Sequence, residues 1–294
     1  MRLVCPLILL LMVPAFAFAQ AQEPRMEAMV IADGDSGSQW DAAEATMEPD
    51  GTHAREGRAM HFHIDVNHET GQPDYPIGWP RTNTGVPAEY QDWRRWDFVD
   101  FWLYSDTSRE ELPSTPLGFI VRSPDRPNSF STTLSDARKG EWTHFRFPTS
   151  DMPNPAECTR VQFFISESNY NHGDTVDFWI DDLALLRYAE PTIIDMHPLN
   201  RVQYADAQVV RVQIDLTGLQ EGETAEVLAK LVCNDSPVRQ GSERLGPGVH
   251  TIPLKVGGNM PVGQYEVQAR IVGGDRVITD PMRVISSPWE GEEQ

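Results

Sequence analysis

The chain has 294 residues, a formal net charge of −20 and a pI near 4.7. This acidity disfavours nucleic acid and anionic membranes as partners, because a phosphate backbone needs a basic patch to bind. A neutral ligand, or a cation such as calcium, fits the charge better. The length is sufficient for two ordinary domains.

The N-terminal residues have the features of a secretory signal peptide. Arg2 precedes an apolar run from Leu3 to Phe18, and residues 17–19 form a small-x-small cleavage site. We expect cleavage near Ala19, so residues 1–19 are left out of the domain assignment. No second apolar run of membrane-spanning length follows. The mature chain is therefore expected to be secreted or periplasmic, without a membrane span.

The mature chain keeps two cysteines, Cys158 and Cys233, which fall in segments that we assign to different domains. Two cysteines cannot build a disulfide-rich scaffold. Whether these two form a disulfide is left open by the sequence, and so is the oligomeric state.

Short alternating runs bounded by turn residues predict strands in the first domain, which we place at residues 26–188. Each run is rich in β-branched or aromatic residues. The predicted strands are 27–32, 58–66, 97–104, 117–123, 141–147, 160–166 and 176–186. This pattern predicts a β-sandwich of the jelly-roll kind.

A second set of predicted strands follows Pro191 and defines a domain at residues 191–287. These strands are 192–196, 207–216, 225–233, 249–255, 263–272 and 276–285. So many short strands in about a hundred residues suit an immunoglobulin-like sandwich. The fold class is thus all-β, a jelly-roll β-sandwich followed by an immunoglobulin-like β-sandwich. Residues 288–294 form an acidic tail.

Strand alternation separates an apolar face from a mixed face in four strands of the first domain. The apolar sets predict the core of the sandwich. They are Met60, Phe62, Ile64, Val99, Phe101, Leu103, Leu117, Phe119, Val121, Val161, Phe163 and Ile165. We also expect Trp142, Phe145 and Phe147 to pack inside, and Trp93 and Trp96 to be structural. Trp179 can face either way.

The opposite faces of the same strands mix aromatic rings with hydrogen-bonding groups. They carry His61, His63, Asp65, Trp102, Tyr104, Arg122, Gln162 and Phe164. If the strands share one sheet, its outer face suits a sugar, whose apolar C–H face stacks on a ring and whose hydroxyls need donors and acceptors. An exposed aromatic patch surrounded by polar groups usually marks a binding surface. The alternative is that the N-terminal segment or the second domain covers this face.

The segment 75–96 is long, non-periodic and rich in aromatic residues. Long loops of this kind are often functional or cover a core. Trp79 and Arg81 are the ligand contacts that we expect from this loop. Tyr170, in the segment 169–172, is a further candidate at the rim.

Several motifs in order resemble a known family of secreted modules. They are the Gly57–Met60 strand, the block DWRRWDFVDFWLYSD, then GEWTHFRFP, RVQFFIS and DFWIDDLAL. Together they look like the jelly-roll carbohydrate-binding modules of bacterial carbohydrate-active proteins. The resemblance covers about residues 26–188 and implies polysaccharide or oligosaccharide binding. The segment after Pro191 resembles the immunoglobulin-like spacers of such proteins.

The resemblance also implies a structural calcium ion between the first strand, a nearby loop and the last strand. Asp33, Asp35 and Asp181 occupy the matching places in this sequence. Carboxylates from distant segments are ligands that calcium prefers. The alternative is a solvated acidic loop.

Three functions remain open, with a non-catalytic carbohydrate-binding protein preferred. A jelly-roll polysaccharide lyase could use His63, Tyr104, Gln162 and Arg122, while a glycosidase could use Asp65 and Asp100. His61 and His63 could share a transition metal, although hydrogen bonding is the commoner role. The third possibility is a structural or adhesive spacer protein.

Overall fold

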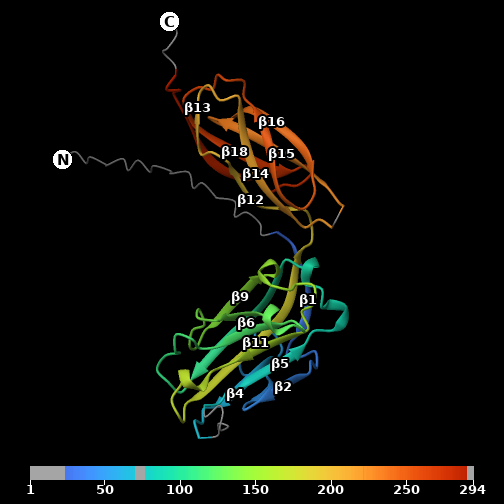
Figure 1. Cartoon of the computed structure of the whole chain (residues 1–294), viewed down its shortest axis with the longest axis vertical. Helices are drawn as coiled ribbons and strands as arrows, with labels where there is room; N and C mark the ends of the chain where they lie inside the picture. The colour runs from blue at the N-terminus through green and yellow to red at the C-terminus, as the bar shows by residue number, and fades with distance from the viewer. Residues whose placement is uncertain (1–23, 70–76, 221, 290–294) are drawn as a thin grey trace, which may run out of the picture.

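The computed structural model describes residues 24–69, 77–220 and 222–289. In these ranges the chain is all-β and forms two sandwiches, which Figure 1 shows end to end. The predicted signal peptide, residues 1–19, lies outside the described residues, as does most of the acidic tail. Within the described ranges, no helix is long and apolar enough to cross a membrane.

The first sandwich begins with a six-stranded sheet in the order β3-β4-β11-β6-β9, with β1 also pairing with β11. All of its pairs are antiparallel. The strands are β1 Met26–Ala32, β3 Thr46–Asp50, β4 Ala59–Asp65, β6 Phe98–Thr107, β9 Trp142–Pro148 and β11 Thr175–Tyr188. The long strand β11 lies in the middle and therefore orients side chains from both of its neighbours.

A five-stranded antiparallel sheet in the order β2-β5-β10-β7-β8 packs against the first sheet. Its strands are β2 Trp40–Ala43, β5 Arg81–Gly85, β7 Gly118–Arg122, β8 Phe130–Thr133 and β10 Arg160–Phe164. Short 3-10 turns join the strands at Ala88–Tyr90, Trp93–Arg95, Arg126–Asn128, Thr149–Asp151 and Glu167–Asn169. The chain passes repeatedly between the sheets, as in a jelly roll.

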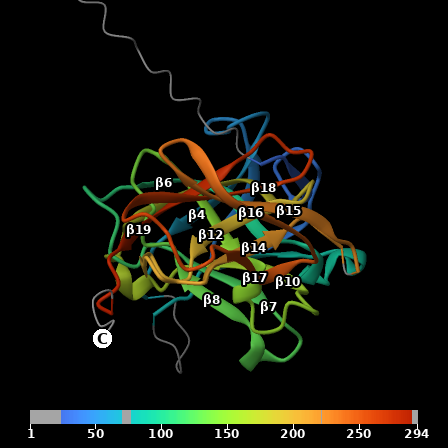
Figure 2. The ribbon, with the colours of Figure 1, turned by 90° about the horizontal axis from the view of Figure 1, so that it is seen from above.

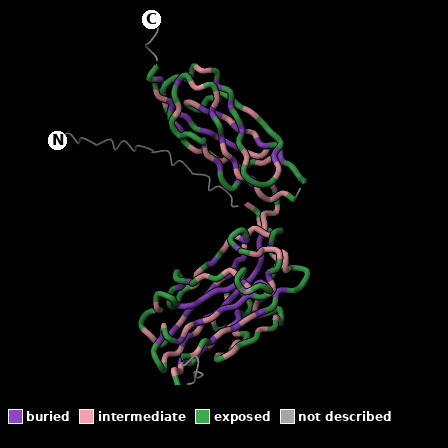
Figure 3. Tube along the Cα trace, in the orientation of Figure 1, coloured by how far each residue is buried: buried purple, intermediate pink, exposed green. Residues whose placement is uncertain are grey.

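The core between the sheets contains the apolar residues that alternation predicts. Phe101, for example, is fully buried and contacts Phe119 and Phe163 with ring centroids 5.0 and 5.2 Å apart. Burying one such side chain contributes about 1.5–3 kcal/mol. Buried residues, purple in Figure 3, lie along the strands inside each sandwich. Trp93 is fully buried, as expected of a structural residue.

Strand β5 lies inside the segment that the sequence analysis treats as a loop. Its inward residues are Thr82 and Thr84, so no apolar alternation marks it. Each buried hydroxyl donates to a main-chain carbonyl, Thr82 to Asp41 and Thr84 to Gln39. Buried polar groups are tolerated when they are paired in this way.

The second sandwich contains a three-stranded sheet, β12-β14-β17, and a five-stranded sheet, β13-β19-β18-β15-β16. The strands are β12 Thr192–Pro198, β13 Val202–Tyr204, β14 Val209–Thr217, β15 Ala225–Cys233, β16 Ser236–Leu245, β17 Gly248–Lys255, β18 Gly263–Ile271 and β19 Ile278–Ile285. A separate apolar cluster fills it, in keeping with a domain of its own. From above, its orange and red strands lie over the first sandwich (Figure 2).

The two sandwiches meet where β11 ends and β12 begins. The Thr217 hydroxyl donates to an Asp97 carboxylate oxygen at 2.8 Å, and the other Asp97 oxygen accepts from the main-chain N–H of Tyr188. Asp97 therefore ties the end of β11 to the second sandwich. Both described cysteines are free, Cys158 being buried and Cys233 partly exposed.

Candidate functional site

The mixed face expected from alternation is divided between two sheets. His61, His63, Asp65, Trp102 and Tyr104 lie on β4 and β6 of the six-stranded sheet. The remaining residues of the predicted face, Arg122, Gln162 and Phe164, lie on β7 and β10 of the five-stranded sheet. The prediction of one shared face is therefore wrong. Alternation tells inside from outside, but it does not tell to which sheet a strand belongs.

Trp102 is not an open stacking platform. The ring of His144 stacks on it with centroids 4.4 Å apart, and the Arg55 guanidinium carbon lies 3.7 Å from its ring centroid. Both groups cannot occupy the same side of one indole at these distances, so they cover its two faces. Arg55 comes from the segment 51–58, which links β3 to β4. Trp102 is half-buried, and these contacts reduce the ring surface left for the ligand contact predicted there.

The neighbouring rings are also packed against one another. His53 stacks on Tyr104 with centroids 4.1 Å apart and meets the edge of Trp179. Trp179 is 6% exposed and stacks on His61 at 4.3 Å. Trp142, expected inside, instead lies half-buried on this outer face with its ring 5.6 Å from Tyr104. The segment 51–58 therefore covers part of this face, where the alternative expected the N-terminal segment or the second domain.

Trp179 is further fixed by a carboxylate. Its indole N–H donates to Asp50 at 2.8 Å, and Thr52 donates to the other Asp50 oxygen through its main-chain N–H and its hydroxyl. The Trp179 bond is the largest influence in lowering the pKa of Asp50 to about 2. Asp50 is therefore ionised at neutral pH and holds the indole ring in place.

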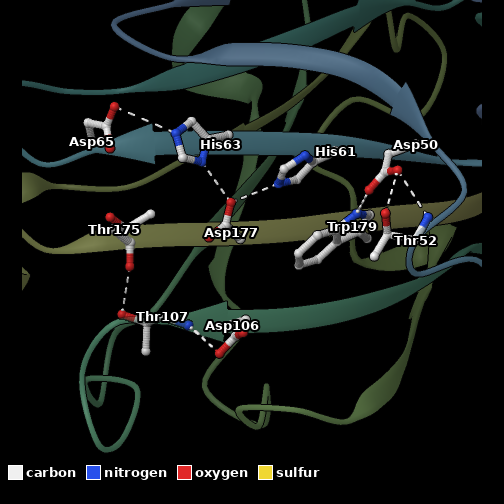
Figure 4. Close-up of polar contacts among 10 residues, drawn as sticks. All are labelled: Asp50, Thr52, His61, His63, Asp65, Asp106, Thr107, Thr175, Asp177 and Trp179. Atoms are coloured by element: carbon white, nitrogen blue, oxygen red, sulfur yellow. Dashed lines mark hydrogen bonds and ion pairs between the residues drawn. The ribbon is translucent and has the colours of Figure 1, made fainter.

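Beside Trp179, two imidazoles and a carboxylate converge on one point (Figure 4). Nε2 of His61 and Nδ1 of His63 each lie 2.7 Å from Oδ1 of Asp177. Burial raises the pKa of Asp177, but the two imidazole hydrogen bonds outweigh it and hold the pKa below its usual value. Burial lowers the pKa of His63, but Asp177 and then Asp65 outweigh it and the pKa is raised. Asp177 was not among the residues expected from the sequence.

The outer face of the five-stranded sheet has a different character. Its side chains stand in cross-strand rows, set by the registers of β5, β10 and β7. One row pairs Arg81 with Phe164 and Phe164 with Gly118. The next row pairs Asn83 with Gln162. An aromatic ring thus stands beside guanidinium and amide groups on one face, the combination that the sequence analysis sought.

Trp79 adds a second ring at the end of the first row. It is 40% exposed, its ring centroid lies 5.5 Å from that of Phe164, and the Arg81 guanidinium carbon lies 5.0 Å from its ring. Its main-chain N–H donates to a Glu44 oxygen at 2.6 Å. The N–H of Gly78 donates to buried Glu167 at 2.9 Å. The main chain that presents Trp79 is therefore anchored by two carboxylates.

Gly118 allows Phe164 to lie against the sheet. A Cβ added at Gly118 would come within 2.2 Å of the Phe164 ring, which is far inside contact distance. Glycine in a strand often marks such a close approach. The Phe164 ring therefore lies over Gly118 and meets Trp79 edge to face, with an interplanar angle of 72°. The sequence signal for this approach is the glycine that begins strand β7.

Gln162 is held by Arg122 and has one unsatisfied atom. The Arg122 Nε and Nη2 atoms donate to its carboxamide oxygen at 3.1 and 2.8 Å. A guanidinium only donates, so the oxygen must face Arg122 and the amide nitrogen must face away. That nitrogen is buried and has no hydrogen-bond partner among the described residues. An unpaired buried donor costs about 1–3 kcal/mol.

Tyr170 does not contact solvent as the sequence analysis expects. It is 3% exposed, and its hydroxyl donates to the main-chain carbonyl of Pro116 at 2.7 Å. Burial raises the pKa of the Tyr170 phenol well above its usual value. The residue closes the core near β7. Its position beside polar Asn169 and Asn171 concealed this in the sequence.

The carboxylates expected to bind calcium are engaged by the chain itself. Asp33 accepts from the main-chain N–H groups of Asp35 and Ser36, and Asp35 accepts from the N–H of Arg58. Asp181 accepts from Arg55, and its burial raises its pKa. Among the described residues, the acids and imidazoles whose ligand atoms converge within 4.8 Å are His61, His63 and Asp177 instead. Calcium stays a prediction.

Neither predicted catalytic set forms one site. His63 and Tyr104 lie on a different sheet from Gln162 and Arg122, so the lyase set is divided. In the glycosidase set, Asp65 pairs with Thr175 and Asp100 with Ala184, nine residues further along β11. At about 3.3 Å per residue this separates them by roughly 30 Å. Glycosidase carboxylates lie within about 10 Å of each other.

Some residues of these surfaces left no clear signal in the sequence. His53 and Arg55 lie in a segment without periodicity. Asp177 did leave one, because it alternates with Trp179 and Asp181 along a predicted strand. Reading that alternation as an outer face would have placed Asp177 beside His61 and His63 in register.

No protein-family model matches the chain, and no curated protein matches its sequence. Among solved structures it is similar to a β-1,2-glucanase from Parabacteroides distasonis, with 11% identity over 89% of this chain and 37% of that one, at a TM-score of 0.38. A carbohydrate-binding module specific for non-crystalline cellulose, CBM28, is 14% identical over 55% of this chain and 96% of the module, at a TM-score of 0.34.

A family 22 carbohydrate-binding module of Clostridium thermocellum Xyn10B is 13% identical over 52% of this chain and 90% of the module, at a TM-score of 0.30. This chain thus spans little more than a third of the glucanase chain. Similarities this low leave the ligand to be argued from the residues of the site.

Proposed function

We propose that this protein binds a polysaccharide or oligosaccharide on the outer face of the five-stranded sheet. The observation that carries the proposal is Trp79, whose ring is 40% exposed at the end of a cross-strand row containing Arg81 and Phe164. On the other outer face, the rings of Trp102, Tyr104 and Trp142 are each partly exposed and pack against residues 51–58 or against one another. Trp79 is more exposed than any of them, which favours the five-stranded face.

The chemistry of this face suits a neutral or acidic sugar. Trp79 and Phe164 offer apolar ring surface to the C–H face of a pyranose. Asn83 offers an amide group to hydroxyls, and Arg81 offers a fork of donors. Strands about 4.8 Å apart make a five-stranded face roughly 19 Å wide, long enough for several sugar rings in a row.

We propose that the protein acts as a secreted, non-catalytic binding protein, with the second sandwich as an immunoglobulin-like spacer. Support comes from the separation of Asp65 from Asp100 and from the division of the lyase set between two sheets. A lyase or glycosidase with another set of residues is the alternative. It is tested by following reducing ends and unsaturated products during incubation with polysaccharides.

The decisive experiment is affinity electrophoresis of the mature chain over plant and algal polysaccharides, with Trp79→Ala and Trp102→Ala as a matched pair. We expect Trp79→Ala to lose about 2 kcal/mol of binding, or roughly thirtyfold in Kd. We expect Trp102→Ala to retain binding once folding is confirmed. Loss of binding with Trp102→Ala alone would place the ligand on the other sheet and refute the proposal.

Two further outcomes of this experiment are informative. Retention by no polysaccharide would favour the spacer function and leave Trp79 without a ligand. If the protein releases sugar products from a polysaccharide and Trp79→Ala abolishes that release, the protein is an enzyme that uses the same face.

A further inference from the structure

The cluster of His61, His63 and Asp177 has a role that sugar binding does not explain. It lies on the six-stranded sheet, outside the rows of Trp79 and Phe164. His61 and His63 project from the same side of β4, and Asp177 stands opposite His63 on β11 (Figure 4). The backbone register therefore brings the three side chains together without help from a loop.

The donor atoms are arranged as a metal ion requires. All three ligand atoms lie within 4.8 Å of one another. Tetrahedral ligands about 2.0–2.2 Å from zinc lie roughly 3.4 Å from each other. The two nitrogens lie 2.7 Å from the Asp177 oxygen, so rotations that move them by less than about 1 Å would admit an ion.

The charges around the cluster favour a cation. The ion pairs of Asp177 are with His61 and His63, and no Lys or Arg of the described ranges forms an ion pair with it. Acidic residues surround it on the neighbouring strands, with Glu48 opposite His61 and Asp106 opposite Asp177. Lys139 lies 3.8 Å from the Asp106 carboxylate, so Asp106 has a partner of its own. At Asp177 itself, positive charge comes from a protonated imidazole or from a bound ion.

Both imidazoles are oriented by a second set of contacts. Nε2 of His63, the nitrogen that faces away from Asp177, lies 3.6 Å from an Asp65 oxygen. His61 stacks in parallel on Trp179, whose indole is fixed by Asp50. Metal-binding histidines commonly have a carboxylate near the other ring nitrogen, which fixes the ring orientation.

We propose that His61, His63 and Asp177 bind one divalent transition-metal ion, with zinc as the ion of choice. Imidazole and carboxylate donors suit Zn²⁺ better than Ca²⁺, which takes oxygen ligands. The three side chains are 24%, 33% and 20% exposed, so solvent can fill the remaining coordination position. The ion would join β4 to β11 next to the covered aromatic face.

The test is a titration of the chelator-treated mature chain with ZnCl₂, with competition by a chromophoric chelator. We expect one Zn²⁺ per chain and at least about tenfold weaker binding by Asp177→Asn, which keeps the shape of the side chain. His197→Ala is the matched control, since His197 Nδ1 lies 3.0 Å from Asp195 in an isolated pair. It should bind zinc within about twofold of the unmodified chain.

A second measurement uses the unmodified chain and so does not depend on the folding of a variant. Modification of histidines by diethyl pyrocarbonate, mapped by mass spectrometry, should fall at His61 and His63 when Zn²⁺ is present and stay unchanged at His197. No stoichiometric zinc binding, or equal modification with and without zinc, would overturn the proposal and leave a protonated imidazole as the partner of Asp177. Neither result bears on sugar binding, which is measured on the other sheet.

Discussion

Trp102→Ala tests whether the outer face of the six-stranded sheet is packed as a small core of its own. Truncating a fully buried tryptophan costs about 3–5 kcal/mol, and Trp102 is half-buried, so roughly 2 kcal/mol is expected from burial. The guanidinium of Arg55, 3.7 Å from the ring, adds about 0.5–1 kcal/mol. The sum is a loss of about 2–3 kcal/mol in the free energy of unfolding.

Urea unfolding followed by tryptophan fluorescence suits this measurement. Trp289 is the one tryptophan of the chain beyond Tyr188, so the signal reports mainly on the first sandwich. The predicted loss corresponds to a fall of roughly 5–10 °C in Tm for a domain of this size. A change within about 0.5 kcal/mol, typical of a surface position, would refute the packing argument.

A double-mutant cycle separates the contributions. Arg55→Met keeps most of the side-chain stem and removes the charge, so its coupling with Trp102→Ala measures the ring–guanidinium contact. We expect a coupling of about 0.5–1 kcal/mol. A coupling of zero would mean that Arg55 covers the ring without stabilising it.

Three further predictions concern single residues. Gly118→Ala places a methyl group against the Phe164 ring, so we expect about 1–3 kcal/mol of destabilisation in urea unfolding. Retention by the polysaccharide in electrophoresis should also weaken. Unchanged values would contradict the close approach. Tyr170→Phe leaves the buried carbonyl of Pro116 unpaired, so the free energy of unfolding should fall by about 1–3 kcal/mol while sugar binding is unchanged. A selective loss of binding would instead indicate that Tyr170 contacts the ligand. Burial raises the pKa of the Cys158 thiol to about 12. At pH 8 a thiol reagent should therefore label Cys233 in the native protein and both thiols after unfolding. Rapid labelling of Cys158 in the native protein would refute its burial.

Much of the fold could be predicted because most of its strands carry a period-two apolar pattern. The β4 and β6 strands were expected almost at their observed bounds, and Phe62 and Phe101 are fully buried as alternation requires. Strand β5 was missed because threonines fill its inward positions. Hydrophobic periodicity detects strands by their apolar side chains, so it does not detect a strand whose inward side chains are hydrogen-bonded hydroxyls.

The candidate site was harder to predict, for a reason inherent in sandwiches. Both sheets turn one apolar face inward, so residues from opposite sides of the molecule share one alternating pattern. Trp79 and Arg81 were proposed from composition, and the structure places both beside Phe164. The packing of Arg55 on Trp102 was not predicted, because Arg55 lies far away in sequence and in a segment without a pattern.

The carboxylates beneath Trp79 also bear on how tightly a ligand can be held. Glu167 accepts from the N–H groups of both Asn67 and Gly78, while Glu44 accepts from that of Trp79. Ordering the backbone of one residue costs about 1–2 kcal/mol in conformational entropy. Because the fold already fixes Gly78 and Trp79, that entropic cost falls on folding and not on association. A weak stacking contact on this face can therefore contribute most of its enthalpy to affinity.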